Sequence, residues 1–312
     1  MNIRNLLSDS YFQQKKVVEK LLCHYAGITK EQLFTSYEKE LTKDEYDAIK
    51  VWYDAYTKDK KPLEFIMWYV EFFQRKFKVD SRCLIPRPET EYMIEGVNEY
   101  VAEQQGLGTR DKGLEKNILI DVWTGCWVLG LSVLLENPWF FENAFLTEYY
   151  PETLSLAKEN YENYKSNLWV KTDIKLLQGN LVAFLLDPSY WLLATNYYIV
   201  ANLPYIPDET FDTQAEDNVK KREPRPAFVW WKDGLDFYRE MFGQLFTYCH
   251  SRESGNPDPA SSAGWHSVTM FLEMMTRQVD ILRQEFGDKI DFEEIKTFHF
   301  NIRIVKGMFK KS

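Results

Sequence analysis

Four consecutive residues after a short apolar run carry groups suited to holding an amino group. The run covers residues 197–201 and predicts a buried strand, and Asn202-Leu203-Pro204-Tyr205 follow it directly. The Asn202 carboxamide oxygen can accept one N–H of a planar amide or amine, the Leu203 carbonyl can accept the second, and the Tyr205 ring can stack on the plane. Such a clamp is typical of enzymes that methylate amino groups. A Pro-terminated turn with a buried tyrosine would contain the same residues, so the surrounding sequence must decide.

A second group of candidate residues lies where an earlier predicted strand, residues 118–122, turns into a helix. In doubly wound α/β folds this first strand-to-helix turn is the cofactor cradle. Glu148 ends the next predicted strand, where a carboxylate binds the ribose hydroxyls of a nucleoside cofactor. An acidic residue at the end of a strand is weak evidence alone. The evidence for a cofactor site is stronger here, because Glu148 ends the strand that follows the cradle. The expected cradle consists of Asp121, Val122, Trp123, Thr124, Gly125, Cys126 and Trp127.

Length, composition and charge limit the class of protein. The 312 residues suffice for one substantial core and a smaller module, so we expect two domains. The chain has no apolar run near the roughly 20 residues of a membrane helix and no signal-peptide core after Met1. A net charge of −9 argues against broad binding to a phosphate backbone, so we expect no direct nucleic-acid partner. The four cysteines are scattered without metal-ligand spacing, which favours a reduced, cytoplasmic protein without a structural metal. We expect a monomer.

The chain is expected to begin with a helical module over residues 1–75. An amphipathic pattern over residues 10–26 stops at Gly27, and capping boxes at Thr29 and Thr42 each open another helix. A module of this kind is either a stabilising cap or a grip on a macromolecular substrate, and the pattern alone favours neither.

The hydrophobic period changes over residues 69–85, which predict a β-hairpin turning at Asp80-Ser81. The hairpin leads into residues 85–91, Ile-Pro-Arg-Pro-Glu-Thr-Glu, where two prolines enforce an extended backbone and direct a charged cluster. Charged loops are usually solvated linkers, but the two prolines favour a positioned loop here.

From about residue 117 the chain alternates between strand and helix patterns. This alternation predicts an α/β fold with a mostly parallel sheet covered by helices on both faces. Residues 251–264 are rich in Ser, Gly, Pro and Asn and predict a loop. Strands are expected at 118–122, 144–148, 174–177, 197–201 and 268–272 and as two runs within 295–308, with helices up to 135 and at 151–164, 235–249 and 276–286.

Four blocks of the chain together resemble a known enzyme family. Residues 84–91 read Leu-Ile-Pro-Arg-Pro-Glu-Thr-Glu, and residues 62–66 with the hairpin after them form a second block. The Asn202 clamp is the third block, and Glu223-Pro224 with residues 232–238 form the fourth. Over essentially its whole length the chain resembles the peptide chain release factor glutamine methyltransferases of the HemK type. The 84–91 block matches that family's signature in full, and Asn-Leu-Pro-Tyr is similar to its Asn-Pro-Pro-Tyr.

The resemblance implies a class I methyltransferase, a Rossmann-like fold with a seven-stranded, mostly parallel sheet. It implies S-adenosyl-L-methionine as cofactor and, as methyl acceptor, the glutamine of the Gly-Gly-Gln loop of a release factor, and hence a role in translation termination. It divides the chain into an N-terminal substrate-recognition domain (1–75), a β-hairpin linker (76–95) and a methyltransferase domain (96–312). The implied catalytic and substrate-binding residues are Asn202, Leu203, Pro204 and Tyr205, with Arg87 and Glu89 either at the site or bracing the linker; the implied cofactor-binding residues are Asp121, Trp123, Thr124, Gly125, Cys126, Trp127, Glu148, Asn180, Leu181 and Asn202.

Two departures from the family pattern are mild. Leu203 stands where the family has proline, but a backbone carbonyl does the hydrogen bonding, so only stiffness is lost. Asn180 replaces the Asp usual after the third strand, and an amide can still hydrogen-bond an adenine amino group.

A third departure concerns tryptophan. The family cradle is Asp-x-Gly-Thr-Gly-x-Gly, whereas this chain has tryptophan at 123 and 127, where two indoles would fill the space of the cofactor. The chain as written is therefore expected to bind S-adenosylmethionine poorly or not at all. We hypothesise that UGA codons that encode glycine were read as tryptophan. The six exchanges for family glycines are Trp68, Trp123, Trp127, Trp230, Trp231 and Trp265.

Two other functions remain open at this stage. An adenine-N6 methyltransferase of rRNA or DNA would use the same clamp, because the clamp cannot distinguish an adenine amino group from a glutamine amide. A non-enzymatic binding protein would follow if Trp123 and Trp127 are genuine and block the cradle.

Overall fold

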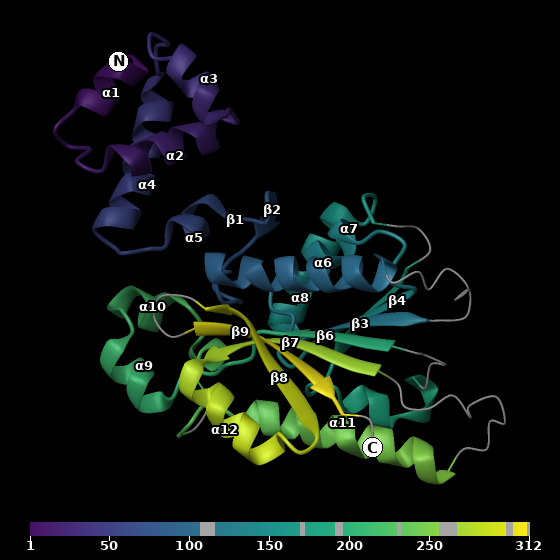
Figure 1. Ribbon diagram of the computed structural model, residues 1–312. Coiled ribbons are helices and arrows are strands. Elements are labelled where there is room, and N and C mark those ends of the chain that lie inside the picture. Colours follow the sequence, from purple (N-terminus) through teal and green to yellow (C-terminus); the bar gives the residue numbers. More distant parts are fainter. Residues whose placement is uncertain are drawn as a thin grey trace.

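The computed structural model describes residues 1–106, 116–168, 172–190, 196–229, 232–255, 267–297 and 302–310. A helical module at the N-terminus leads through a small hairpin into an α/β domain (Figure 1). The module has its own hydrophobic core, separate from the two cores that flank the sheet. Its helices are α1 (Ile3–Ser8), α2 (Lys15–Ala26), α3 (Lys30–Thr35), α4 (Lys43–Thr57) and α5 (Leu63–Met67).

The helix boundaries in this module follow from local sequence signals. Helix α2 ends at Gly27, which adopts the left-handed conformation with φ 62° and ψ 33°. Thr29 and Thr42 each accept a backbone N–H three residues on, and the side chains of Gln32 and Glu45 bond back to the capping residues. The predicted helices and both capping boxes are confirmed.

The hairpin lies earlier in the chain than the sequence predicted. Strands β1 (Tyr69–Phe72) and β2 (Arg75–Lys78) pair antiparallel, with Phe72 opposite Arg75. The two residues between them, Phe73 and Gln74, have φ of 45° and 61°, as the tightest hairpin turns require. The predicted turn at Asp80-Ser81 is wrong. The true turn residues, Phe73 and Gln74, include neither the Gly nor the Asn that usually marks such a turn. Asp80 instead forms a separate turn after the hairpin, accepting the backbone N–H of Arg82.

The α/β domain contains one seven-stranded sheet with the strand order β5-β4-β3-β6-β7-β9-β8. Strands β3 to β7 run parallel to one another, and β9 pairs antiparallel with both β7 and β8. This confirms the predicted seven-stranded, mostly parallel, Rossmann-like sheet. The strands are β3 (Asn117–Val122), β4 (Asn143–Glu148), β5 (Asp173–Gln178), β6 (Asn196–Ala201), β7 (Ser267–Met275), β8 (Ile290–Thr297) and β9 (Ile302–Phe309).

Helices cover both faces of the sheet, as expected. Helices α6 (Glu91–Gly106), α7 (Val128–Glu136) and α8 (Pro151–Tyr164) pack on one face, and α11 (Asp236–Gly255) and α12 (Thr276–Phe286) pack on the other (Figure 1). Helix α6 was not predicted, and it runs across the expected domain boundary at residue 95.

Two short helices follow the clamp, and part of one predicted loop is helical. Helices α9 (Asp208–Gln214) and α10 (Asp217–Arg222) follow the clamp, and a small apolar cluster that includes Phe211 and Phe228 packs against Leu84. The predicted loop at 251–264 is wrong for residues 251–255, which belong to α11; residues 256–264 lie outside the described residues. Among the described residues, no helix combines the length and apolar character that crossing a membrane requires.

The sheet order places three loops at one edge. Strand β3 lies between β4 and β6, and the chain crosses from one side of β3 to the other after β5. At such a switch point, the loops after the strands diverge and leave a crevice at their carboxyl ends. The cradle follows β3, Glu148 is the last residue of β4, and the Asn202 clamp follows β6.

A buried asparagine in α8 connects the hairpin to the cradle. The Asn160 Oδ1 accepts the backbone N–H of Lys78 at 2.8 Å, and its Nδ2 donates to the carbonyls of Lys78 at 3.0 Å and Cys126 at 2.8 Å. Asn160 has no exposed surface. Its amide therefore satisfies three backbone groups that would otherwise have no access to water.

We expect Asn160→Ala to lower the free energy of unfolding by about 1–3 kcal/mol, because it leaves these backbone groups buried without partners. Urea unfolding followed by circular dichroism measures this loss. Asn163→Ala, the same exchange at an exposed position one turn along α8, is the control and should change stability by less than about 0.5 kcal/mol. Equal effects of the two variants would contradict a bracing role for Asn160.

Candidate active site

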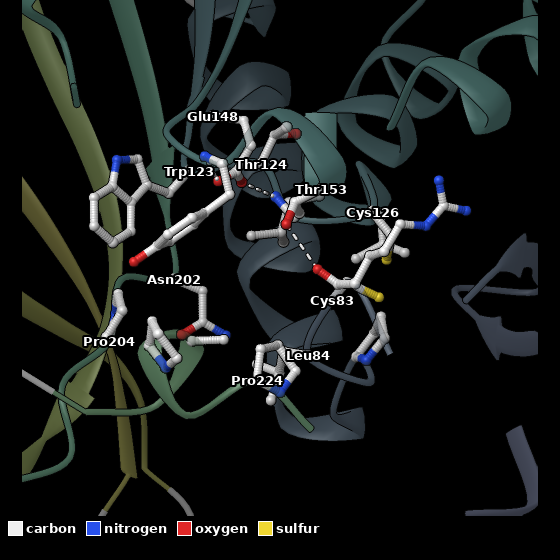
Figure 2. A pocket seen from close by; sticks show the side chains of 18 of the residues that line it. Cys83, Leu84, Trp123, Thr124, Cys126, Glu148, Thr153, Asn202, Pro204 and Pro224 are labelled. Carbon is white, nitrogen blue, oxygen red and sulfur yellow. Dashed lines mark hydrogen bonds between the residues drawn. The ribbon is translucent and has the colours of Figure 1, made fainter. Parts of the chain in front are cut away.

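A cavity of about 380 Å³ opens at the carboxyl ends of β3, β4 and β6. Its walls come from the loop after β3, the end of β4, the clamp after β6 and the Pro-rich signature loop. Figure 2 shows Trp123, Glu148, Asn202 and Pro204 around this space. The structure thus brings together the three regions that the sequence singled out. Of the predicted site residues, the cavity is lined by Trp123, Thr124, Gly125, Cys126, Glu148, Asn202 and Pro204.

Asp121 shapes the cradle from below and does not line the cavity. Its Oδ2 accepts the Thr124 hydroxyl at 2.6 Å and the backbone N–H of Gly130, in the first turn of α7, at 2.8 Å. Burial raises the pKa of Asp121 to about 6, against the lowering effect of these two hydrogen bonds. A Cβ on Gly130 would lie 2.7 Å from Oδ2, so the close approach of α7 to Asp121 needs a glycine.

Glu148 lies at the cavity wall and holds the cradle from the side. One carboxylate oxygen accepts the backbone N–H of Gly125 at 3.1 Å, and the other accepts that of Tyr150 at 3.0 Å. Burial raises the pKa of Glu148 to about 7, although both hydrogen bonds favour the charged form. Glu148 is 4% exposed, and its carboxylate keeps lone pairs that could accept a ligand hydroxyl; a ribose-binding role for it remains a prediction.

Two predicted cofactor residues lie away from this cavity. The Asn180 Nδ2 donates to the Glu240 carboxylate at 2.6 Å, and Leu181 is fully buried with φ 52°. Trp123, which lines the cavity, packs against the same hydrophobic core that contains Leu181. Their assignment to an adenine site remains a prediction.

The indole of Trp123 occupies the space next to the cradle. Its ring centroid lies 4.2 Å from that of Phe237, 6.0 Å from Tyr149 and 6.5 Å from Tyr150. The indole Nε1 is buried without a hydrogen-bond partner. A polar N–H sealed among aromatic rings is unfavourable.

Trp127 begins α7 in an equally unusual way. Its backbone is left-handed, with φ 71° and ψ 30°, and its indole is fully buried against Tyr161. The Trp127 Nε1 also lacks a partner. The residues present therefore do not fit S-adenosylmethionine. The Trp123 indole takes up space at the cavity wall where the family pattern has glycine, and both cradle positions, 123 and 127, carry tryptophan on a left-handed backbone that favours glycine.

The clamp is held by a buried carboxylate that the sequence did not single out. The Thr90 hydroxyl donates to one oxygen of Glu273 at 2.7 Å, and the Tyr205 hydroxyl donates to the other at 2.8 Å. The Asn202 Nδ2 in turn donates to the Thr90 oxygen at 3.2 Å. Burial raises the pKa of Glu273 above its usual range, while the bonds from Thr90 and Tyr205 act against that shift. These bonds join the signature loop, the clamp and β7.

The backbone of the clamp is fixed as well. Gln278, in the first turn of α12, donates through Nε2 to the carbonyls of Tyr205 and Asp233, both at 2.7 Å. A Cβ on Gly234 would come within 2.1 Å of the Tyr205 carbonyl oxygen, and Gly234 has φ 72°. Only glycine permits this approach, which explains the Lys-Asp-Gly segment after the clamp. The Leu203 side chain is buried in the core.

Arg87 braces the signature loop and does not line the cavity. Its Nη2 donates to Glu223 at 2.8 Å, and the second Glu223 oxygen accepts the backbone N–H of Ile85 at 2.8 Å. Glu223 is 6% exposed, so this ion pair is largely shielded from water. Glu89 does not line the cavity either, although its charge lies near enough to Glu273 to raise the pKa of that carboxyl. A substrate-binding role for Arg87 and Glu89 remains a prediction.

Sequence reasoning missed four residues that support the site. The hydrogen-bond partners through which they support it lie far away in the sequence. Thr90 lies inside the recognised signature, but nothing local indicated that it pairs with β7. Glu273 follows the predicted strand 268–272 directly, and an acid in an apolar strand is the signal that could have identified it. The four missed residues are Thr90, Glu223, Glu273 and Gln278.

Comparisons with known proteins were made for both fold and sequence. No protein family model matches the chain. The N-terminal domain of human METTL16 in complex with SAH aligns with a TM-score of 0.47 and 13% identity over 75% of each chain. The Mtq2-Trm112 complex of E. cuniculi, described as responsible for the methylation of the eRF1 translation termination factor, aligns with a TM-score of 0.39 and 14% identity over 74% of this chain and 99% of that chain.

Curated proteins named release factor glutamine methyltransferase are similar in sequence. The protein of Bacillus cereus is 29% identical over 227 residues, which cover 73% of each chain. That of Thermodesulfovibrio yellowstonii is 29% identical over 249 residues and 79% of each chain. That of Caulobacter vibrioides is 27% identical over 243 residues, 78% of this chain and 76% of the relative. The chain, whose Asn202 clamp lies at the switch point of a mostly parallel sheet, is homologous to these release factor glutamine methyltransferases.

Proposed function

We propose that the natural protein, which the codon hypothesis gives glycine at positions 123 and 127, transfers a methyl group from S-adenosyl-L-methionine to the side-chain amide nitrogen of the glutamine in the Gly-Gly-Gln loop of peptide chain release factors. The observation that carries the proposal is the Asn202 clamp, which lies at the cavity beside Glu148 and is oriented by Thr90 and Glu273. The name of the homologous proteins favours glutamine over adenine as acceptor. The cofactor supplies a methyl group on a positively charged sulfur.

A glutamine amide is a poor nucleophile, because its nitrogen lone pair is delocalised into the carbonyl. An enzyme that uses it must therefore fix the nitrogen in line with the methyl group, and positioning of this kind is worth effective molarities of roughly 10⁵ M or more. The donor and acceptor directions of the hydrogen bonds from Asn202 through Thr90 to Glu273 suit the positioning of the substrate amide. The Thr90 proton goes to Glu273, so the Thr90 oxygen accepts from the Asn202 Nδ2. The Asn202 Oδ1 is left to accept an N–H of the substrate.

The remaining clamp groups complete the hold on the amide. The Leu203 carbonyl accepts the second substrate N–H, and the Tyr205 ring covers the amide plane. The bond from the Tyr205 hydroxyl to Glu273 fixes the direction of that ring. Gly234 and Gln278 fix the backbone on which both groups depend. No strong base is needed, because the proton can leave after methyl transfer.

The proposal is tested by offering the protein two substrates with radiolabelled S-adenosylmethionine. The Trp123→Gly/Trp127→Gly protein is the reference enzyme, because the printed cradle is obstructed. We expect label in a bacterial release factor, on the loop glutamine by peptide mass spectrometry, and none in rRNA. Label in rRNA alone would replace this function with the adenine alternative.

We expect Asn202→Ala in the reference enzyme to lower kcat for release factor at least about 100-fold, because the amide nitrogen of the substrate glutamine is no longer oriented toward the methyl group. The affinity for S-adenosylmethionine, measured by calorimetry, should change less than about threefold. Asn196→Ala is the matched control, since Asn196 lies at the opposite end of the same strand and bonds to Asn117. Full activity of Asn202→Ala would remove the clamp mechanism.

Glu273 acts in this proposal as a positioning residue, through Thr90 and Tyr205. We expect Glu273→Gln and Tyr205→Phe each to lower kcat by roughly 10- to 100-fold while the KM for release factor changes less than about threefold. Because both variants alter the hydrogen bond between the Tyr205 hydroxyl and the side chain at 273, their effects should be strongly non-additive in the double variant.

Tyr197→Phe supplies the control for this cycle. It removes a buried hydroxyl bond of 2.6 Å to Tyr248, at the amino end of β6 and away from the clamp. It should cost stability without changing kcat. Additive losses from Glu273→Gln and Tyr205→Phe, or a kcat loss in Tyr197→Phe of the same size, would reduce Glu273 to a structural role.

A further inference from the structure

The tryptophans of this chain occupy a backbone conformation that bulky residues avoid. The described residues contain five of them: Trp52, Trp68, Trp123, Trp127 and Trp139. Four of the five have positive φ: 65° at Trp68, 53° at Trp123, 71° at Trp127 and 77° at Trp139. In this left-handed region the Cβ collides with the backbone, so an amino acid as large as tryptophan is a genuine outlier there.

Each of these positions is a reversal of the chain where glycine is the usual residue. Trp68 ends α5 with φ 65° and ψ 16°, nearly the conformation of Gly27 at the end of α2, φ 62° and ψ 33°. Trp123 and Trp127 flank Gly125, which itself has φ 56°. Trp139 lies just beyond the end of α7.

The indoles do not compensate for this backbone strain. Trp68 and Trp139 are 54% and 65% exposed, so their large apolar surfaces remain mostly in water. Trp123 and Trp127 are covered, but each buries an indole N–H without a partner. Trp52 is different in every respect: it lies inside α4, and its ring packs against His24 and Tyr25.

We infer that the natural protein carries glycine at 68, 123, 127 and 139, and that the tryptophans printed there arise from UGA codons that its own genetic code reads as glycine. Four independent Gly-to-Trp substitutions, all at left-handed positions, would each have to survive selection against strain. One reassigned codon accounts for all of them together. The inference adds Trp139, which is not among the six exchanges predicted from the family pattern, and it leaves Trp52 as a true tryptophan. The other predicted exchanges, Trp230, Trp231 and Trp265, lie outside the described residues.

Glycine at these positions changes the candidate site. Without an indole at 123, the space bordered by Tyr149, Tyr150 and Phe237 joins the cavity beside Glu148. Aromatic rings next to a ribose-binding acid suit a purine nucleoside. This last step rests on the proposed function, whereas the assignment of the four glycines rests on backbone conformation alone.

The first experiment reads the codons and the natural protein. We expect UGA at 68, 123, 127 and 139 and UGG at 52. Peptide mass spectrometry of the protein isolated from its own cells should find glycine at the first four positions and tryptophan at 52. UGG at the four positions, or tryptophan in their natural peptides, overturns the inference.

The second experiment tests the conformational argument in the printed chain. Trp68→Gly and Trp139→Gly should each raise the urea midpoint of unfolding, with a severalfold gain in the folding equilibrium constant, because strain is relieved and little packing is lost. Trp52→Gly is the control and should lower the midpoint, since it puts glycine inside a helix and removes a packed ring. Losses at 68 and 139 as large as that at 52 would contradict the strain argument.

The third experiment separates this inference from the proposed function. Calorimetry with S-adenosylmethionine should show binding to the Trp123→Gly/Trp127→Gly protein and at least about tenfold weaker binding to the printed chain. If the codons are UGA and the glycine protein still does not bind, the four glycines stand and the proposed cofactor fails. If the printed chain binds equally well, the indole at 123 does not obstruct the site.

Discussion

The buried carboxylate of Glu273 joins three parts of the molecule that are far apart in the sequence. A carboxylate without partners in a protein interior is strongly unfavourable, so its two oxygens need donors that reach them from elsewhere. The hydroxyls of Thr90 and Tyr205 supply those bonds, one from the signature loop and one from the clamp. The dependence is mutual, because the same bonds hold Thr90 and Tyr205 in place. The signature loop, the clamp and β7 therefore form one unit at the cavity.

Two other buried polar groups extend this arrangement to the rest of the site. Asn160 connects the hairpin to the cradle through backbone groups of Lys78 and Cys126. Glu223 connects the start of the signature loop to the segment after the clamp through Ile85 and Arg87. Each is a single side chain that satisfies backbone or charged groups from distant segments. Apolar packing alone would hold these loops near one another, but hydrogen bonds fix their direction.

The cradle shows how a fold can keep its shape while the site inside it is obstructed. The turn after β3 is set by Asp121, Thr124 and Glu148, which bond to its backbone and to the start of α7. In this turn the backbone is left-handed at 123, 125 and 127. The backbone therefore reports which residue type each position demands, and at 123 and 127 that type is glycine. At these two positions the tryptophan side chains are at odds with the backbone conformation, but the strands and helices around them keep the expected arrangement.

The sequence by itself determined the local elements and the identity of the key segments. Capping boxes at Thr29 and Thr42, the helix end at Gly27 and the buried parallel strands were predictable, because these signals lie within a few residues of the structure they specify. The cradle, Glu148 and the clamp were recognisable as motifs, and their meeting at one sheet edge followed from the expected parallel sheet.

Only the tertiary structure decided which side chains support that site. Three contacts depend on how the strands are ordered and on segments that are distant in the sequence. Glu273 lies 183 residues from Thr90 and 68 residues from Tyr205, and Glu223 lies 136 residues from Arg87. The third contact places Gly234 against the Tyr205 carbonyl. The hairpin turn at Phe73 and Gln74 was missed because neither residue is a usual turn former. Helical and strand periods are encoded locally, whereas a buried hydrogen bond between distant segments exists only once the whole sheet has assembled.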